Sequence, residues 1–162
     1  MTTSLLTVAE LARVVSRLEH RPCSSRRVRY LLVVGGLGTD THRRRHGQTR
    51  LYGVLDVALV RLAVRLEREG VSPSVTRVVL TYLRNDLIKA WRAGALLGLA
   101  VRGVRGSLEP VLKARPAWAV AWVPLREIWR GLDAEVRRIG DARQTLWMWR
   151  DVPIHEIPRA GA

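Results

Sequence analysis

The stretch 24–36 is the part of this chain that most limits its fold. Three aliphatic residues recur at the i, i+3 and i+4 spacing of one helix face: Val28, Leu31 and Leu32. The opposite side and its margin carry four polar residues: Arg26, Arg27, Arg29 and Tyr30. Ser24 or Ser25 can cap this helix, and Gly35-Gly36 can end it. We therefore expect a helix over about 24–34 with one buried stripe and one arginine-rich face, suited to a groove of DNA.

The surrounding pattern predicts a compact helical unit. Thr7 and Glu10 form a capping box, and apolar residues at helical spacing continue to about Leu18. Residues 38–52 lack apolar periodicity and are basic, so we expect a β-hairpin or wing there. Two further helices should follow, one with the stripe Leu55, Leu59, Leu62 and Leu66, and one with the stripe Val75, Val78, Val79, Tyr82 and Leu83. Ser72-Pro73 should open the second of these, and Trp91 lies near its end.

Charge points to a polyanionic partner. The net charge is +14, and residues 1–50 hold ten Lys or Arg against three Asp or Glu, which is +7, half of the excess. A field of this sign attracts nucleic acid first and anionic membrane second. The arginines of the helix have no acidic residue at i±3 or i±4, which argues against an ordinary solvated face.

The order of these features resembles the DNA-binding domain of the MerR family of bacterial transcription regulators. Five short stretches carry the resemblance: 6–12, the Val28-Arg29-Tyr30 motif, Gly36-Leu37, Arg50-Leu51-Tyr52 with Asp56, and 70–72. It covers roughly residues 5–88. The turn between the first two helices is longer than usual, Leu31 stands where the family has a second Tyr, and Thr49 stands where it has the first Tyr of the wing.

The resemblance implies a winged helix-turn-helix. Arg29 and Tyr30 would lie at the DNA, Arg50 at phosphate in the wing, and Tyr52 would pack the wing onto the domain. The residues themselves add Ser25, Arg26 and Arg27 on the helix and Arg43, Arg44 and Arg45 at the wing tip. Phosphate contacts would supply affinity and base contacts specificity. The family also implies a homodimer and, by analogy, RNA polymerase as a partner.

The second half resembles no family. Apolar runs at 95–101 and 117–123 predict short buried strands, separated by Gly- and Pro-bearing loops. Pro124 should open a well-patterned helix with the stripe Leu125, Ile128, Trp129, Leu132, Val136 and Ile139, ended by Gly140. This stripe is the candidate dimer interface. The six tryptophans are more typical of core or interface than of a ligand pocket.

We expect a mainly α fold with a small β component. Its parts are a winged helix-turn-helix domain at 5–94, a small α/β region at 95–152 and a flexible tail at 153–162. Cys23 is the only cysteine and cannot form an intramolecular disulfide, and no signal peptide or membrane span is evident, so the cytoplasm is expected. The sequence predicts no metal, cofactor or enzyme activity. A zinc site built from His20, Cys23, His42 and His46 is the weaker hypothesis, because its first ligand pair would be His20 and Cys23 and not the usual two cysteines.

The sequence therefore predicts sequence-specific binding of double-stranded DNA by a transcription regulator. Two alternatives stay open. One is a phage or mobile-element excision or architectural factor, which would bend DNA through the same kind of domain. The other is a basic RNA-binding protein without DNA sequence preference. A membrane-surface role is disfavoured because no lysine-rich amphipathic helix is evident.

Overall fold

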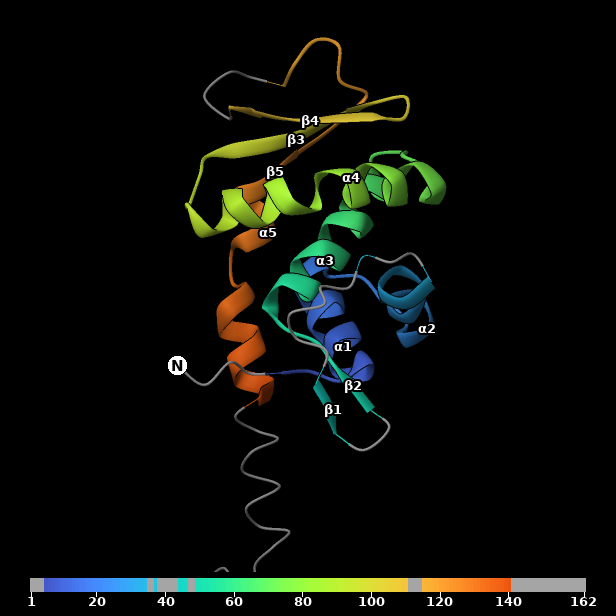
Figure 1. The fold of residues 1–162 in the computed structure, drawn as a ribbon, viewed down its shortest axis with the longest axis vertical. Coiled ribbons are helices and arrows are strands. Elements are labelled where there is room, and N and C mark those ends of the chain that lie inside the picture. The colour runs from blue at the N-terminus through green and yellow to red at the C-terminus, as the bar shows by residue number, and fades with distance from the viewer. Residues whose placement is uncertain (1–4, 35–36, 38–43, 47–48, 111–114, 141–162) are drawn as a thin grey trace, which may run out of the picture.

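The computed structural model describes residues 5–34, 37, 44–46, 49–110 and 115–140. Its elements are α1 (Val8–Glu19), α2 (Ser25–Arg29) with a π-helical continuation η1 (Tyr30–Val34), β1 (Arg44–His46), β2 (Thr49–Leu51), α3 (Val54–Arg68), α4 (Pro73–Arg92), β3 (Leu97–Arg102), β4 (Arg105–Pro110), β5 (Ala121–Pro124) and α5 (Leu125–Trp129). Residues 132–140 are also helical. The protein is thus mainly helical, with a three-stranded antiparallel sheet and a separate two-stranded hairpin (Figure 1).

Helix α3 is the centre of the molecule. It packs on α1, α4, α5 and β5, and residues 55–63 are all buried. A helix buried on every side belongs inside a core rather than on its surface. The predicted stripe of four leucines is confirmed as buried, but it is only part of the buried surface of this helix.

Helix α4 begins as predicted, because Ser72 caps it and Pro73 occupies its first turn. Its predicted stripe is partly wrong. Val79 and Leu83 are buried, whereas Val78 is 49% exposed and Tyr82 is 83% exposed. The inward face instead follows Thr76, Leu80, Leu87 and Ala90. An aromatic residue at helical spacing therefore does not by itself mark the buried side of this helix.

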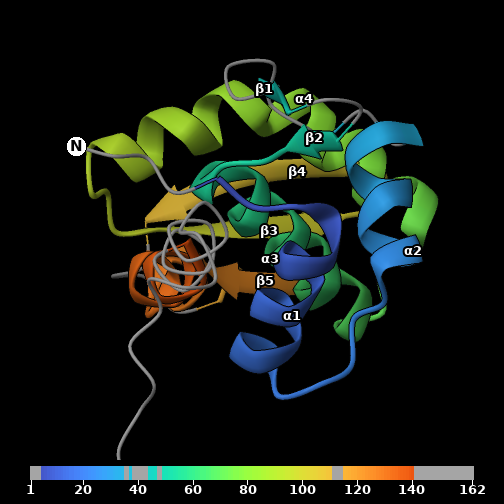
Figure 2. The same ribbon diagram turned by 90° about the horizontal axis from the view of Figure 1, so that it is seen from below.

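The sheet has the order β4-β3-β5 and covers α3 and α4 (Figure 2). Strands β3 and β5 are the two predicted apolar runs, and their inward residues include Leu99, Val101 and Val123. On the other face the Trp122 ring lies against Gly98, where an added Cβ would come within 2.2 Å of the ring. Strand β4 was not predicted, because an edge strand of sequence RGSLEP has no apolar alternation.

The helix predicted to begin after Pro124 is broken. It ends at Trp129, and Gly131 adopts a left-handed φ of 71° before the chain turns helical again over 132–140. Four residues of the predicted stripe are buried in the core of the same chain: Leu125, Ile128, Leu132 and Val136. Their burial removes this stripe as a dimer interface.

A single hydrophobic cluster runs from Leu6 to Val136. The predicted boundary at residue 94 therefore separates two stretches of sequence that share one core. The predicted tail at 153–162 lies outside the described residues, and so does Arg43 of the predicted wing tip. Within the described part of the chain, no helix has the length and apolarity needed to cross a membrane.

Candidate nucleic-acid interface

Helix α2 has the two faces that its sequence predicts. Val28, Leu31 and Leu32 are each at most 1% exposed and lie in the core. The opposite side presents an exposed set: Ser25, Arg26, Arg29 and Tyr30. The aliphatic side fixes the helix on the body, so the polar side is held in one orientation toward solvent.

The start of α2 is set by hydroxyl groups. Ser24 is the N-cap, and its Oγ accepts a hydrogen bond from the Arg27 amide at 3.1 Å. Ser16 of α1 ties down the preceding turn, because its Oγ accepts from the Cys23 amide at 2.8 Å and donates to the Ala12 carbonyl at 2.7 Å. These bonds give the turn before α2 a defined path. The sequence pattern of α1 does not reveal this role of Ser16, because its partner Cys23 lies beyond the end of the helix.

Arg27 differs from the other arginines of the helix. Its guanidinium forms an ion pair with Glu67 of α3 and lies 5.6 Å from the centre of the Tyr30 ring. Its side chain is 29% exposed. Although α2 itself carries no acidic residue, the tertiary fold supplies one from α3. Arg27 thus holds α2 against α3, and Arg26 and Arg29 are the exposed arginines.

The β1–β2 hairpin is the second part of the candidate interface. Arg45 pairs with Arg50 across the hairpin, and Arg44 pairs with Leu51. For these arginines the structure describes the backbone alone, and Arg43 lies outside the described residues. The hairpin and α2 lie on the same side of the molecule (Figures 1 and 2).

The hairpin is anchored at its base. Tyr52 directly follows β2 and forms an antiparallel bridge with Leu6, with two backbone hydrogen bonds of 2.8 Å each. The Tyr52 side chain is only 2% exposed, so it packs the hairpin onto the core and is not available as a DNA contact. Asp56 continues this anchor, because its buried carboxylate accepts a hydrogen bond from the Gly53 amide at 2.9 Å and so caps α3.

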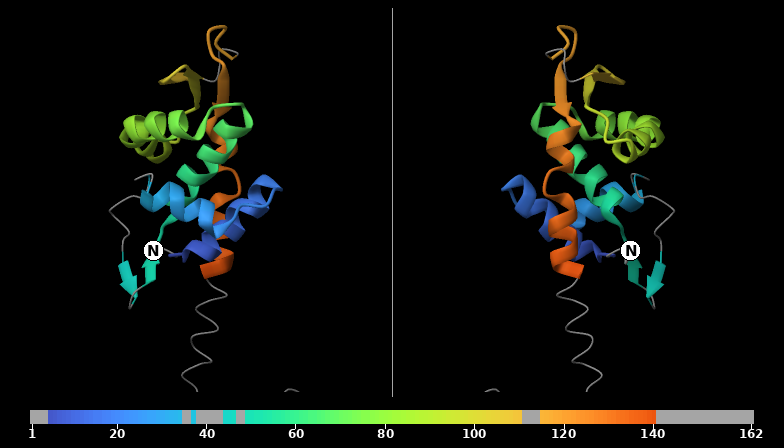
Figure 3. Two further views of the ribbon diagram at one scale, coloured as in Figure 1. Left: turned by 90° about the vertical axis from the view of Figure 1, so that its right-hand side faces the viewer. Right: turned by 90° about the vertical axis from the view of Figure 1, so that its left-hand side faces the viewer.

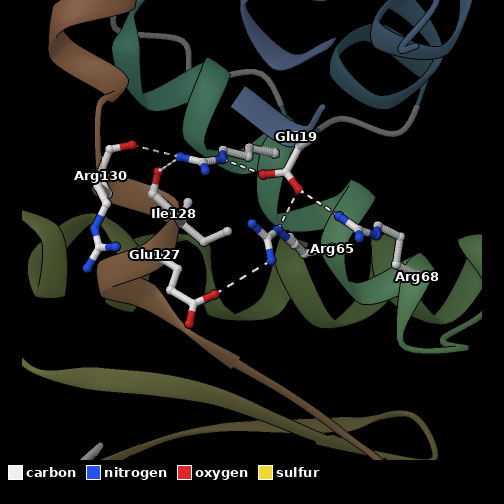
Figure 4. Close-up of polar contacts among 7 residues, drawn as sticks. Glu19, Arg65, Arg68, Glu127, Ile128 and Arg130 are labelled. Atoms are coloured by element: carbon white, nitrogen blue, oxygen red, sulfur yellow. Dashed lines mark hydrogen bonds and ion pairs between the residues drawn. The ribbon is translucent and has the colours of Figure 1, made fainter. Parts of the chain in front are cut away.

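A buried charge network holds the unit of α1 and α2 on the rest of the protein. The Glu19 side chain is fully buried at the end of α1 and contacts three arginines of α3: Arg61 at 2.5 Å, Arg65 at 2.5 Å and Arg68 at 3.2 Å (Figure 4). Arg61 also donates to the carbonyl oxygens of Ile128 and Arg130, at 2.6 and 3.0 Å.

This network joins α1, α3 and the break after α5. It was not predicted from the sequence. Two sequence features belong to this network: Glu19 at the end of α1, and the arginines that interrupt the apolar sequence of α3. Neither feature reveals its partner, because Glu19 and Arg61 are far apart in the sequence and meet only in the folded chain.

The cysteine and histidines gather no metal site in the described part of the chain, where no three metal-binding side chains come together. His42 lies outside that part. Burial raises the pKa of the Cys23 thiol, opposed by the Arg27 charge and reinforced by Glu67. At neutral pH Cys23 is therefore a protonated, weakly reactive thiol.

Comparisons with protein-family models, with curated proteins and with solved structures gave no match.

Proposed function

We propose that this protein binds double-stranded DNA in a sequence-specific manner, as a transcription regulator of the winged helix-turn-helix type. In this proposal α1 and α2 form the helix-turn-helix, α2 lies in the major groove, and the β1–β2 hairpin is the wing on the flanking backbone. The observation that carries the proposal is the exposed face of α2, which presents Arg26, Arg29 and Tyr30 from a helix fixed by its buried side.

The chemistry of these side chains fits base and phosphate recognition. An Arg guanidinium can donate two parallel hydrogen bonds to a guanine edge or to a phosphate. Arg26 and Arg29 are exposed, and no ion pair with a carboxylate is seen for either among the residues that the structure describes. Their charge is thus available to an external anion. The hairpin adds Arg44, Arg45 and Arg50, which suit contacts to the backbone on either side of the groove.

Arg27 has a supporting role in this scheme. Its ion pair with Glu67 and its position over Tyr30 orient the exposed tyrosine and fix the helix. We therefore place Arg27 among the residues that position α2 and keep Arg26 and Arg29 as the direct contacts.

The proposal is tested by fluorescence anisotropy with a labelled duplex and with structured RNA as competitor. Arg26→Ala/Arg29→Ala should weaken duplex binding by at least about tenfold, since one good bidentate contact contributes about 1–3 kcal/mol. The matched control is Arg126→Ala/Arg137→Ala, which removes the same charge from exposed positions on α5 and in 132–140. These elements lie on the other side of the molecule from α2 (Figure 1).

Equal losses in the two variants would show that net charge alone drives binding, and would contradict a recognition role for α2. Preferential displacement of the duplex by structured RNA would favour the alternative of a basic RNA-binding protein. Unchanged melting temperatures are required of both variants, so that a loss of binding is not a loss of fold.

A further inference from the structure

The sheet of the C-terminal half carries a second arginine-bearing hairpin. Strands β3 and β4 are joined by a two-residue turn, Gly103-Val104, and the last register pair before it is Arg102 opposite Arg105. Gly103 has a φ of 57°, as the first central residue of a type II′ turn requires. The turn therefore fixes the two arginines side by side at the end of a rigid ribbon.

Among the described residues, no acidic side chain forms an ion pair with the arginines at this turn. Arg102 and Arg105 are both exposed. Like charges directly opposite each other on two strands destabilise a hairpin. The only acid of β4, Glu109, accepts a hydrogen bond from Ser107 at 2.7 Å and lies toward the other end of the strand.

A third arginine adds to the same end of the sheet. The Arg115 guanidinium donates to the Val120 carbonyl at 2.6 Å, and the Val120 amide donates to the Val101 carbonyl at 2.9 Å. The Arg115 guanidinium also donates to the Ala119 carbonyl, at 2.9 and 3.3 Å, so it is held by backbone acceptors. Arg115 thus adds a positive charge beside Val120, which bonds to the end of β3 that precedes the turn.

Apolar side chains accompany these arginines. Val104 is 65% exposed at the turn, and Val120 is 60% exposed beside β3. Arginines combined with an exposed apolar residue are typical of protein segments that bind along the minor groove. An anion without apolar surface, such as free phosphate, would not account for the two valines.

The position of the β3–β4 turn is compatible with one DNA duplex that contacts both this turn and α2. The β3–β4 turn and α2 lie on the right-hand side in Figure 1, with the turn above α2. The β1–β2 hairpin lies below α2 along the long axis and projects toward the front of that view (Figures 1 and 3). A duplex bound to α2 would therefore have an arginine-bearing hairpin on either side of this helix along the long axis.

We propose that the β3–β4 turn is a second DNA-binding element, which contacts the phosphates and minor groove of the duplex beyond the segment read by α2. The inference rests on the proposed function, because it assigns a further surface to the same duplex. It gives the C-terminal half a role in lengthening the bound site. Since phosphate contacts carry no sequence information, this element should add affinity without changing the preferred sequence.

The test compares Arg102→Ala/Arg105→Ala with the control Arg126→Ala/Arg137→Ala in the full chain. Log K falls with log salt, and each lost phosphate contact reduces the steepness of that fall by about 0.9. The steepness should therefore decrease by about 2, and affinity at 0.15 M salt should fall by roughly 10- to 30-fold. Hydroxyl-radical footprinting should show protection lost on one flank only. The preferred sequence should stay as in the wild type, and the melting temperature should not fall below it, because the variant removes two opposed like charges.

The outcomes separate this inference from the proposed function. A wild type that binds no duplex refutes both. A wild type that binds through Arg26 and Arg29, with the slope and footprint unchanged in Arg102→Ala/Arg105→Ala, refutes the second element alone. A loss of RNA binding with DNA binding intact would also overturn it. If the double alanine variant melts early, Arg102→Gln/Arg105→Gln tests the same contacts with longer side chains retained.

Discussion

Replacing Glu19 by Gln should destabilise the protein strongly. The Glu19 carboxylate is fully buried and, among the residues that the structure describes, is the only negative charge in contact with Arg61, whose side chain is 5% exposed. Glu19→Gln keeps the shape of the side chain but leaves the Arg61 charge buried without a counter-ion. Breaking a buried ion pair by removing one partner costs about 3–5 kcal/mol.

The expected cost lies near the lower end of that range, about 3 kcal/mol, because the amide oxygen of Gln can still accept one hydrogen bond. Arg65 and Arg68 are 29% and 39% exposed and can recover hydration, so their charges add little to the penalty. For a chain of this size each kcal/mol lowers the melting temperature by about 2–4 °C, which gives a decrease of roughly 6–12 °C.

Urea unfolding followed by tryptophan fluorescence measures this change. The control is Glu135→Gln, which removes a carboxylate that contacts Arg17 at 3.7 Å and Arg138 at 3.2 Å near the surface. A surface pair contributes about 0–1 kcal/mol, and its effect should shrink in high salt. The effect of Glu19→Gln should persist in high salt.

A second change separates buried charge from loss of packing. Adding Arg61→Met to Glu19→Gln removes the uncompensated charge, so the double variant should be more stable than the sum of the two single changes predicts. A Glu19→Gln variant within about 1 kcal/mol of the wild type would refute the reasoning, because the carboxylate would then not compensate the buried arginine.

Two further predictions follow from the anchor of α3 and from the turn before α2. Asp56→Ala removes the acceptor of the Gly53 amide and should lower the free energy of unfolding by about 1–2 kcal/mol, measured in urea, with a loss under 0.3 kcal/mol contradicting the capping role. Burial raises the pKa of the Cys23 thiol, so alkylation by iodoacetamide at pH 7.5 should be slower in the folded protein than in urea. The free energy of unfolding should keep the contribution of this thiol at neutral pH, and should lose it as the pH rises through the usual thiol range toward the raised pKa. Equal alkylation rates in the two states would contradict that shift.

Several parts of the fold follow from local sequence chemistry. The capping box of Thr7 and Glu10, the Ser72 cap and the buried stripe of α2 all rest on residues within one or two helical turns of each other. The same holds for strands β3 and β5, because a short apolar run predicts a buried strand whichever strand it pairs with. Periodicity and capping report such short-range constraints directly.

The remaining features depend on contacts between distant residues. Strand β4 exists because β3 offers it a backbone to pair with, and the break at Gly131 lies where Arg61 binds the carbonyl oxygens of Ile128 and Arg130. A continuous apolar stripe hides such a break, because both halves still face the same core.

In the candidate site, too, some features follow from nearby residues and others depend on contacts between residues far apart in the sequence. The sequence predicts which face of α2 is exposed, but the pairing of Arg27 with Glu67 separates that arginine from its neighbours and needs the fold. Tyr52 is buried at the base of the hairpin, as the resemblance implies, but its bridge to Leu6 is seen only in the folded chain.

The most direct test of the central claim is selection of bound sequences from a random pool of duplex DNA. We expect the wild type and Arg126→Ala/Arg137→Ala to enrich the same motif, and Arg26→Ala/Arg29→Ala to lose it; an inverted repeat would further indicate two copies of the protein at each site. Salt-sensitive binding without any enriched motif, or a motif that is indifferent to Arg26 and Arg29, would contradict sequence-specific recognition through α2.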